Sequence, residues 1–284
     1  MSRPRVPDPL VTAAYLTGWR VLRMLPESAA LRLFQAIADR IYARNGRSVR
    51  RLRANLAHVV PAADLEAATA EAVRSYLRYW CEVFRLPTWT RTQILSRTRV
   101  IGEQHLDEGL AAGKGVVVAL PHMANWDWAG AWVCARHAPL MTVAERLEPT
   151  RVFDAFVAFR ESLGFTVLPL SGGEPPLPRL AQWLREGGLV CLLADRDMSS
   201  SAVGVNFLGA RARFPVGPAV LAERTGAALV AATLAYRGRD LEITFTPVPS
   251  GDTAERTQHL ADLFAAGIAA DPVDWHMMQR VFDA

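Results

Sequence analysis

The feature that most constrains this 284-residue sequence is an alternation of short apolar runs with longer stretches of helical periodicity. Short, continuous apolar runs are typical of strands buried on both faces of a sheet, and helices between them would cover those faces. The expected strands are 116–120, 140–143, 167–169, 189–194, 228–234 and 241–245. The expected helices are 62–86, 103–112, 126–136, 150–163, 175–186 and 216–225. The pattern predicts an α/β fold, in which helices flank a central twisted, partly parallel sheet.

We expect one domain over residues 1–284, because neither a linker-like segment nor an internal repeat interrupts the later part of the chain. Within it we expect a catalytic α/β core at 100–250 and an N-terminal cap of amphipathic helices at 1–60. Hydrophobic residues make up 51% of the chain and charged residues 21%, which excludes a disordered or fibrous protein. The three cysteines lack metal or redox spacing, so we expect reduced thiols in the cytosol and no bound metal.

Positive charge is concentrated at the N-terminus. Residues 1–53 contain eleven Arg and three acidic residues, a net charge of +8, so the remainder carries −4 of the total +4. A basic arm beside a mildly acidic body favours an anionic partner surface. An aromatic-rich RNA motif, a zinc finger or a helix-turn-helix pattern does not accompany these arginines. We therefore expect an anionic membrane surface as partner, and no nucleic acid.

The first part of this basic arm is expected to lie on the membrane. The apolar run 10–25 is too short to span a bilayer and contains Arg20 and Arg23, and a signal-peptide cleavage site does not follow it. We expect a helix in the interface at the cytoplasmic face of the cell membrane, as in peripheral, monotopic proteins. The side chains expected to enter the lipid are Leu10, Ala14, Trp19, Leu22 and Leu25. Alternatively, this helix and a second amphipathic helix at 27–44 pack on the catalytic body.

The chemistry is expected where the strand 116–120 ends. The sequence there reads Pro121-His122-Met-Ala-Asn125-Trp-Asp127, with Asn125 as the expected N-cap of the next helix. Ligands of open α/β sheets collect at the carboxyl ends of strands, which favours His122 as a catalytic group over a structural turn histidine. The Asp127 carboxylate can reach back to the imidazole and fix its tautomer. Because a His-x4-acid spacing arises by chance about 0.6 times in such a chain, its position after a buried strand carries most of the argument.

Several blocks of this sequence resemble those of one protein family. The first block runs from Gly102-Glu103 through 113–128, and the others are 194–197, 206–209, 213–219 and 223–227. Their order is similar to that in the bacterial lipid acyltransferases of the lipid A biosynthesis type, and the resemblance covers about residues 10–250. Within the family, the chain most resembles the actinobacterial branch that acylates phosphatidylinositol mannosides. The motif acid is Asp127, where lipid A enzymes often carry Glu, and the N-terminal apolar run is too short to span a membrane.

The resemblance implies an acyl-CoA-dependent O-acyltransferase. It implies transfer of a palmitoyl-type chain from acyl-CoA to a mannose hydroxyl of a phosphatidylinositol mannoside or related glycolipid, at O6 of the mannose on inositol O2. Acyl-CoA is then a co-substrate, and we expect no cofactor. An alcohol must lose its proton as it attacks a thioester, which suits a neutral imidazole. Because a G-x-S-x-G nucleophile elbow does not occur, we expect direct transfer with His122 as general base.

A carboxylate is expected to orient His122 and to stabilise its protonated form. By resemblance that carboxylate is Asp195, at the end of the strand 189–194, and Asp127 competes for the same role. Both are therefore candidate catalytic residues beside His122. For either Asp, the alternative is a residue that caps a helix or closes a turn.

Arginines are expected to bind the anionic groups of acyl-CoA or of the acceptor, because guanidinium matches phosphate geometry. The resemblance places an active-site arginine at Arg160, and Arg224 ranks beside it. Other candidates for substrate binding are Arg196, Arg213, Glu145, Arg146 and Ser201. For any single arginine, the alternative is a solvated surface charge.

Two other functions stay open at this point. The same fold and chemistry would suit a lysophospholipid, an acyl-ornithine lipid or a lipid A precursor as the acceptor. The second alternative is a non-catalytic membrane protein that binds lipid or acts as a scaffold. The presence of His122 and Asp127, together with Asp195 and Arg160, argues against it.

Overall fold

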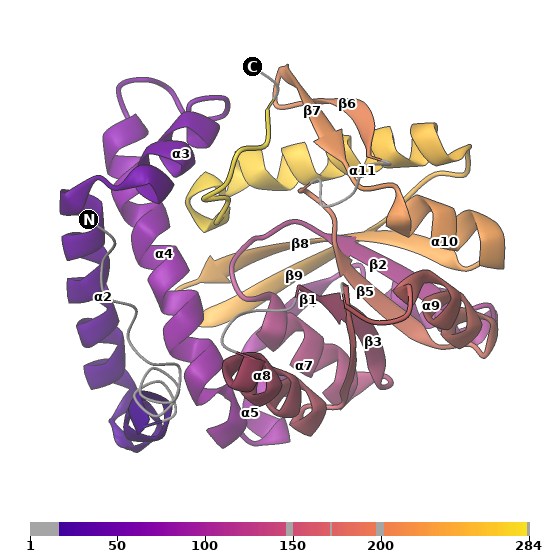
Figure 1. Ribbon diagram of the computed structural model, residues 1–284, viewed down its shortest axis with the longest axis horizontal. Helices are drawn as coiled ribbons and strands as arrows, with labels where there is room; N and C mark the ends of the chain where they lie inside the picture. Colours follow the sequence, from indigo (N-terminus) through magenta and orange to yellow (C-terminus); the bar gives the residue numbers. More distant parts are fainter. Residues whose placement is uncertain (1–16, 146–149, 171, 197–201, 283–284) are drawn as a thin grey trace.

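The structure, a computed structural model, describes residues 17–145, 150–170, 172–196 and 202–282. Within these residues, seven strands form one sheet in the order β1-β9-β8-β2-β5-β3-β4 (Figure 1). Their bounds are β1 (Thr98–Ile101), β2 (Val116–Leu120), β3 (Leu140–Ala144), β4 (Phe165–Pro169), β5 (Leu189–Leu193), β8 (Ala228–Arg237) and β9 (Asp240–Pro247). A separate antiparallel hairpin consists of β6 (Val203–Phe207) and β7 (Ala210–Phe214).

Most strand pairs of the large sheet are parallel. β2 pairs in parallel with β5 and β8, and β3 pairs in parallel with β4 and β5. β9 returns antiparallel beside β8 and pairs in parallel with β1. Every residue of β2 is buried, as its uninterrupted apolar run requires of a central strand. The carboxyl ends of β2, β5, β3 and β4 therefore meet at one edge of the sheet.

Helices cover both faces of the sheet, which confirms the predicted α/β fold (Figure 1). α6 and α7 contact one face, and α9, α10 and α11 contact the other. The packing is close, because a Cβ on Gly130 of α7 would lie 2.4 Å from the Phe165 ring. The bounds are α6 (Gln104–Ala111), α7 (Trp126–Arg136), α8 (Thr150–Ser162), α9 (Pro176–Arg185), α10 (Gly217–Thr225) and α11 (Thr253–Ala270).

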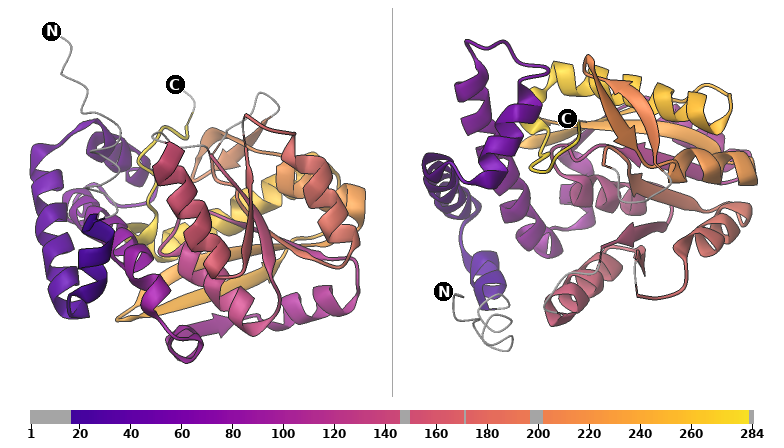
Figure 2. Two further views of the ribbon diagram at one scale, coloured as in Figure 1. Left: turned by 60° about the horizontal axis from the view of Figure 1, so that its bottom comes forward. Right: turned by 45° about the horizontal axis from the view of Figure 1, so that its top comes forward.

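The predicted N-terminal helices form a layer at one side of the sheet (Figures 1 and 2). It consists of α2 (Glu27–Arg44), α3 (Arg47–Leu56) and α4 (Leu65–Arg85). α2 packs on α4, with the rings of Phe34 and Phe84 6.3 Å apart. The second amphipathic helix thus buries its apolar stripe against the protein itself, which is the alternative that the sequence left open.

The expectation for the first helix is wrong over the part that the structure describes. Residues 17–24 are helical, but Trp19 is 6% exposed, and its ring centre lies between 5.4 and 5.7 Å from those of Phe84, Phe156 and Phe159. Leu22 and Leu25 also pack against the core, whereas Leu10 and Ala14 lie outside the described residues. The Trp19 indole packs against this aromatic cluster, and its N–H donates to the Phe84 carbonyl at 2.7 Å. Because both its apolar and its polar parts have partners in the protein, the indole is buried there. Among the described helices, none is both long and apolar enough to cross a membrane.

Sequence periodicity missed β1, the β6–β7 hairpin, α5 (Arg91–Ser96) and α11. The strands β1, β6 and β7 are short and partly exposed, so they do not form continuous apolar runs. α11 begins with a capping box, in which Asp252 accepts from the Glu255 N–H and Glu255 accepts from the Asp252 N–H. That spacing of Asp and Glu is a signal from which the helix start could have been predicted.

Candidate active site

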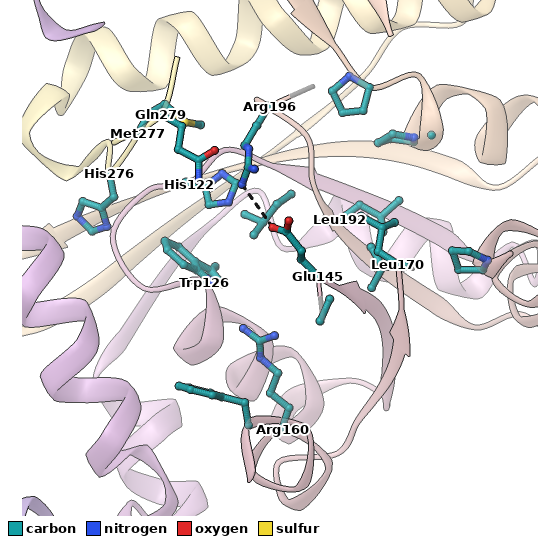
Figure 3. A pocket seen from close by; sticks show the side chains of 18 of the residues that line it. His122, Trp126, Glu145, Arg160, Leu170, Leu192, Arg196, His276, Met277 and Gln279 are labelled. Carbon is teal, nitrogen blue, oxygen red and sulfur yellow. Dashed lines mark ion pairs between the residues drawn. The ribbon is translucent and has the colours of Figure 1, made fainter. Parts of the chain in front are cut away.

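Side chains from four neighbouring parallel strands meet around one cavity. His122 follows β2, Glu145 follows β3, Leu170 follows β4 and Arg196 follows β5, and all four line the cavity (Figure 3). The cavity has a volume of about 600 Å³, and α4, α8, α9, α10 and residues 276–279 complete its largely apolar wall. Such a cavity suits a largely apolar ligand whose few polar groups are held by specific side chains.

His122 is paired with Asp195 across the ends of β2 and β5. The imidazole Nδ1 lies 2.6 Å from Asp195 Oδ1, and the His122 backbone N–H donates to Asp195 Oδ2 at 2.9 Å. A carboxylate only accepts hydrogen bonds, so Nδ1 carries a proton and Nε2 is the basic nitrogen of the neutral ring. The Asp195 side chain is fully buried, whereas that of His122 is 23% exposed at the cavity.

Asp195 is ionised despite its burial. Burial by itself raises the pKa of a carboxyl group, but attraction to His122 and hydrogen bonds from His122 and Trp275 outweigh burial and lower the pKa of Asp195. The Trp275 indole supplies the third of these hydrogen bonds, to Oδ2 at 2.9 Å. A buried charge fixed in this way can orient an imidazole and stabilise its protonated form.

The turn that carries His122 is held by side chains of the following helix and of α4. Asn125 caps α7 as predicted, because its side-chain oxygen accepts from the Trp128 N–H at 2.9 Å. Its amide group donates to Glu82 Oε2 of α4, also at 2.9 Å. Within this turn, between His122 and Asn125, Ala124 has a φ of +42°, which is uncommon for a residue other than glycine. Through the hydrogen bond to Glu82, the N-terminal helical layer thus helps to hold the backbone turn that contains His122.

Asp127 does not reach back to His122; it pairs with Arg160 and Tyr79 instead. Arg160 Nε and Nη2 donate to its two oxygens at 2.6 and 3.1 Å, and the Tyr79 hydroxyl donates to Oδ2 at 2.9 Å. The first turn of α7 aims the carboxylate toward α8 and α4, away from the end of β2. Spacing alone could not show this, since the partners come from other parts of the chain.

The charges of this second pair depend on each other. Burial lowers the pKa of Arg160, but the Asp127 carboxylate outweighs burial and raises it above the ordinary value for arginine. Burial and the same carboxylate raise the pKa of Tyr79 well above its ordinary value. Asp127 is 1% exposed and the Arg160 side chain 19%, so removing either charge would leave the other largely buried and unpaired.

The side chains of Glu145 and Arg196 point toward one another at the cavity wall near His122 (Figure 3). Arg196 Nη1 lies 3.8 Å from Glu145 Oε2, and the two side chains are 25% and 54% exposed. This is a loose ion pair that a polar ligand can displace. The candidates Arg146 and Ser201, next to these segments in the sequence, lie outside the described residues.

Arg213 and Arg224 are not among the described residues that line the cavity. Arg213 lies on β7 and donates to the Ala202 carbonyl at 2.9 Å. Arg224 lies in the last turn of α10, exposed, whereas the cavity is lined by the first turns of that helix. The structure thus brings His122, Asp195, Asp127, Arg160, Glu145 and Arg196 together, and leaves these two arginines apart.

Sequence reasoning missed residues that come from distant parts of the chain. Tyr76 and Tyr79 of α4 line the cavity, and so does His276, which follows η2 (Pro272–Asp274). His276 Nε2 lies 2.9 Å from Ser75 Oγ, and burial, with the nearby His122, lowers the pKa of His276 to about 3. His276 is therefore neutral at pH 7. The sequence around residue 275 does not indicate that this segment lies beside His122, because the contact joins parts of the chain that are far apart in sequence.

One group of described residues has metal-ligand chemistry, and it lies away from the cavity. Glu103, Asp107 and His137 place one ligand atom each within 4.8 Å of one another. Arg136 Nε is 2.8 Å from Glu103, and the two nitrogens of His137 are 3.4 Å from Glu103 and 3.3 Å from Asp107. The carboxylates thus already have cationic or polar partners.

The known proteins that this chain resembles are acyltransferases. Residues 2–283 match the family described as bacterial lipid A biosynthesis acyltransferase. Over 275 residues the chain is 49% identical to the phosphatidylinositol mannoside acyltransferases of two Mycobacterium tuberculosis strains, covering 94% of this chain and 86% of each relative. It is 47% identical over 272 residues to the protein of that name from Mycolicibacterium smegmatis, covering 93% of this chain and 89% of the relative. These matches show that the chain is an acyltransferase and belongs to the bacterial lipid A biosynthesis acyltransferase family.

Proposed function

We propose that this acyltransferase moves a palmitoyl-type chain from acyl-CoA to a mannose hydroxyl of a phosphatidylinositol mannoside, at O6 of the mannose on inositol O2. The observation that carries the proposal is the His122–Asp195 pair beside a largely apolar cavity of about 600 Å³. The relatives named phosphatidylinositol mannoside acyltransferase support this class of acceptor. The particular hydroxyl rests on the resemblance alone.

In the proposed mechanism, His122 is the general base. Its Nε2 takes the proton of the acceptor hydroxyl as the oxygen attacks the thioester carbonyl, and Asp195 stabilises the imidazolium that forms. When the tetrahedral intermediate collapses, the C–S bond breaks and the imidazolium returns its proton to the leaving thiolate. The hydrogen bond from Nδ1 to Asp195, 2.6 Å long, holds the ring in the tautomer that this sequence of steps needs.

The apolar wall of the cavity is proposed to hold the acyl chain. It contains Phe153, Phe156 and Val157 of α8 on one side, and Leu177 of α9 and Leu221 of α10 on the other. Transfer of an alkyl chain from water into such a surface contributes about 0.8 kcal/mol for each methylene group. The polar groups of the wall, Arg160, Arg196 and Glu145 among them, would then bind the sugar or phosphate groups of the two substrates.

The test is thiol release from palmitoyl-CoA with three acceptors offered in parallel. These are a phosphatidylinositol mannoside, a lysophospholipid and a lipid A precursor. We expect turnover with the mannoside, and a loss of about 10²–10⁴-fold in kcat in the His122→Ala variant. The matched control is His105→Ala, which removes a histidine of α6 outside the cavity wall. Turnover with another acceptor only would overturn the substrate, and turnover retained in His122→Ala would overturn the mechanism.

We further propose that the N-terminal helices dock on an anionic membrane surface. Because Trp19 is buried in the protein, other apolar side chains, which are exposed on these helices, would contact the membrane. Met24 is 85% exposed, Val21 51%, Leu33 47% and Ile37 39%, within a segment of net charge +8. Exposed apolar groups that lie among arginines match an anionic interface.

Vesicle sedimentation tests this docking proposal. We expect binding to anionic vesicles, weaker binding to neutral ones, and release by Met24→Glu. The matched control is Ile101→Glu, which places the same charge at an exposed apolar residue of β1. Equal binding to neutral and anionic vesicles, or equal effects of the two variants, would contradict the proposal.

A further inference from the structure

Trp275 is a buried side chain beside the His122–Asp195 pair to which the proposed reaction gives no role. Its side chain is fully buried, and its indole N–H donates to Asp195 Oδ2 at 2.9 Å. The same oxygen accepts the His122 backbone N–H, while Oδ1 accepts from the imidazole. Trp275 is therefore the one donor to Asp195, among the described residues, that does not come from His122 itself.

The backbone on both sides of Trp275 is bonded to the turn that carries His122. Trp275 forms an antiparallel bridge with Met123. The Ala124 N–H donates to the Asp274 carbonyl, and the His276 N–H donates to the His122 carbonyl, each at 2.8 Å. The donor is thus placed before any substrate binds, and it needs no rearrangement to act on Asp195.

The segment that carries Trp275 is also anchored to the N-terminal helical layer. Asn55 of α3 is 4% exposed, and its amide group donates to the Met277 carbonyl at 2.8 Å and to the Gln279 carbonyl at 2.7 Å. On the other side, the Phe207 ring meets the indole edge-on, with 5.8 Å between the ring centres. Backbone hydrogen bonds of its segment and a ring contact thus hold Trp275 beside Asp195.

We infer that Trp275 is a positioning residue that sets the proton affinity of His122 by sharing the negative charge of Asp195. A hydrogen bond donated to a carboxylate takes up part of its charge, so the carboxylate attracts an imidazolium less strongly. With Trp275 in place, Asp195 therefore holds a proton on His122 less strongly, which suits a general base that has to pass its proton on. The inference rests on the proposed role of His122 as general base.

Other charged and titratable groups also face this pair, and they set the background for a pH measurement. Those from the surrounding elements are Glu145 and Arg196 at the strand ends, Asp127 of α7 with Arg160 of α8, Tyr76 and Tyr79 of α4, and His276. Asp127 is paired with Arg160 at 2.6 Å, and Glu145 lies 3.8 Å from Arg196 in the loose ion pair described above. Because a substitution at Trp275 leaves all of them in place, a shift in the pH dependence reports on the indole N–H.

The experiment compares Trp275→Phe with the wild-type enzyme in two measurements. The first is the pH profile of kcat/KM, whose acid limb reports the base of the free enzyme. The second is an NMR titration of the His122 imidazole, which does not depend on turnover and is assigned with His122→Ala. We expect both midpoints to move to higher pH by about half to one unit, the size expected for one lost hydrogen bond. We also expect kcat to fall several-fold.

A matched control separates this effect from a loss of packing. Trp128→Phe removes another fully buried indole, which donates to Thr98 at 2.9 Å and does not line the cavity. If Trp275→Phe fails to fold, benzothienylalanine at position 275 keeps both fused rings and lacks only the N–H. If the midpoints of Trp275→Phe moved no further from the wild-type values than those of Trp128→Phe, the inference would be overturned. Full activity in His122→Ala would instead overturn the proposed base, a separate outcome.

Discussion

Isosteric replacement of the two aspartates, one at a time, should separate catalysis from stability. Asp195→Asn and Asp127→Asn remove the same charge and add the same amide group, each in a buried site. Their partners differ, because Asp195 contacts the imidazole and Asp127 contacts Arg160 and Tyr79. We expect the first variant to lose activity with little loss of stability, and the second to lose mainly stability.

For Asp195→Asn, the structure predicts the wrong tautomer of His122. The amide oxygen would take the place of Oδ2, which accepts from the His122 N–H and from Trp275. The amide NH₂ would then face Nδ1 and donate to it, so the ring proton would move to Nε2, the nitrogen that has to accept the hydroxyl proton. We expect kcat to fall about 10³–10⁴-fold. Because the hydrogen bonds are largely replaced, unfolding should cost only about 1 kcal/mol less.

For Asp127→Asn, the main effect is an uncompensated charge on Arg160. Breaking a buried ion pair by removing one partner typically costs about 3–5 kcal/mol. The amide oxygen of Asn keeps one hydrogen bond, and the Arg160 side chain is 19% exposed, so the lower end of about 3 kcal/mol applies. With an unfolding entropy of about 2.1 cal/mol/K per residue, that is a fall of about 5 °C in Tm. Arg160 lines the cavity, so a higher KM is expected as well.

Differential scanning calorimetry and thiol release from palmitoyl-CoA measure the two effects on the same preparations. The kinetic comparison is made at a temperature at which both variants are folded. If Asp127→Asn melted like the wild type and lost as much kcat as Asp195→Asn, Asp127 would act in the chemistry. The geometric assignment of the two carboxylates would then be wrong.

Three further predictions concern single contacts. Gly130→Ala should lower the free energy of unfolding by about 1–3 kcal/mol, because its Cβ meets a phenylalanine ring, whereas Gly18→Ala, with open space around it, should not; equal stability of the two variants would contradict this. The depressed pKa of His276, about 3, means that its contribution to stability is complete above about pH 6.5 and is lost as pH falls toward 3. In His276→Gln the free energy of unfolding should therefore decline less steeply over this pH range, and an unchanged decline would refute the prediction. Arg196→Ala should raise the KM for acyl-CoA more than Arg224→Ala, since only Arg196 lines the cavity, and the reverse order would return Arg224 to the site.

The sequence allowed the sheet to be predicted better than the site. β2 and α7 have the predicted bounds, because a continuous apolar run and a capped helix are local properties of the chain. The same local signals placed His122 at the carboxyl end of a strand. The partner of His122 depends on which strand lies beside β2, and strand order is not a local property. Asp195 was therefore available only from resemblance, and spacing alone suggested Asp127.

Residues that reach the site from the ends of the chain gave no local signal at all. Trp275 and His276 follow η2 in the sequence. Backbone hydrogen bonds and a β-bridge connect their segment to the turn at 122–124. Tyr79 is one of several aromatic residues at helical spacing on α4, and periodicity cannot distinguish the one that bonds to Asp127. What distinguishes these residues is a partner distant in sequence, which only the fold supplies.

The N-terminal helices show the same limit for a surface, and this leads to a quantitative expectation about the membrane. Amphipathic periodicity identifies a buried stripe but not what covers it, and here Trp19 and Phe34 are covered by protein. From residue 17 onward, where the structure describes these helices, four exposed apolar side chains remain, and each contributes at most about 1.5–3 kcal/mol on full burial. Arginines near an anionic surface add about 1 kcal/mol each. Because the two contributions act together, we expect high salt, which screens the arginines, and Met24→Glu, which removes the most exposed of these apolar groups, each to weaken binding to anionic vesicles. Binding left unchanged under either condition would show that another surface holds the protein.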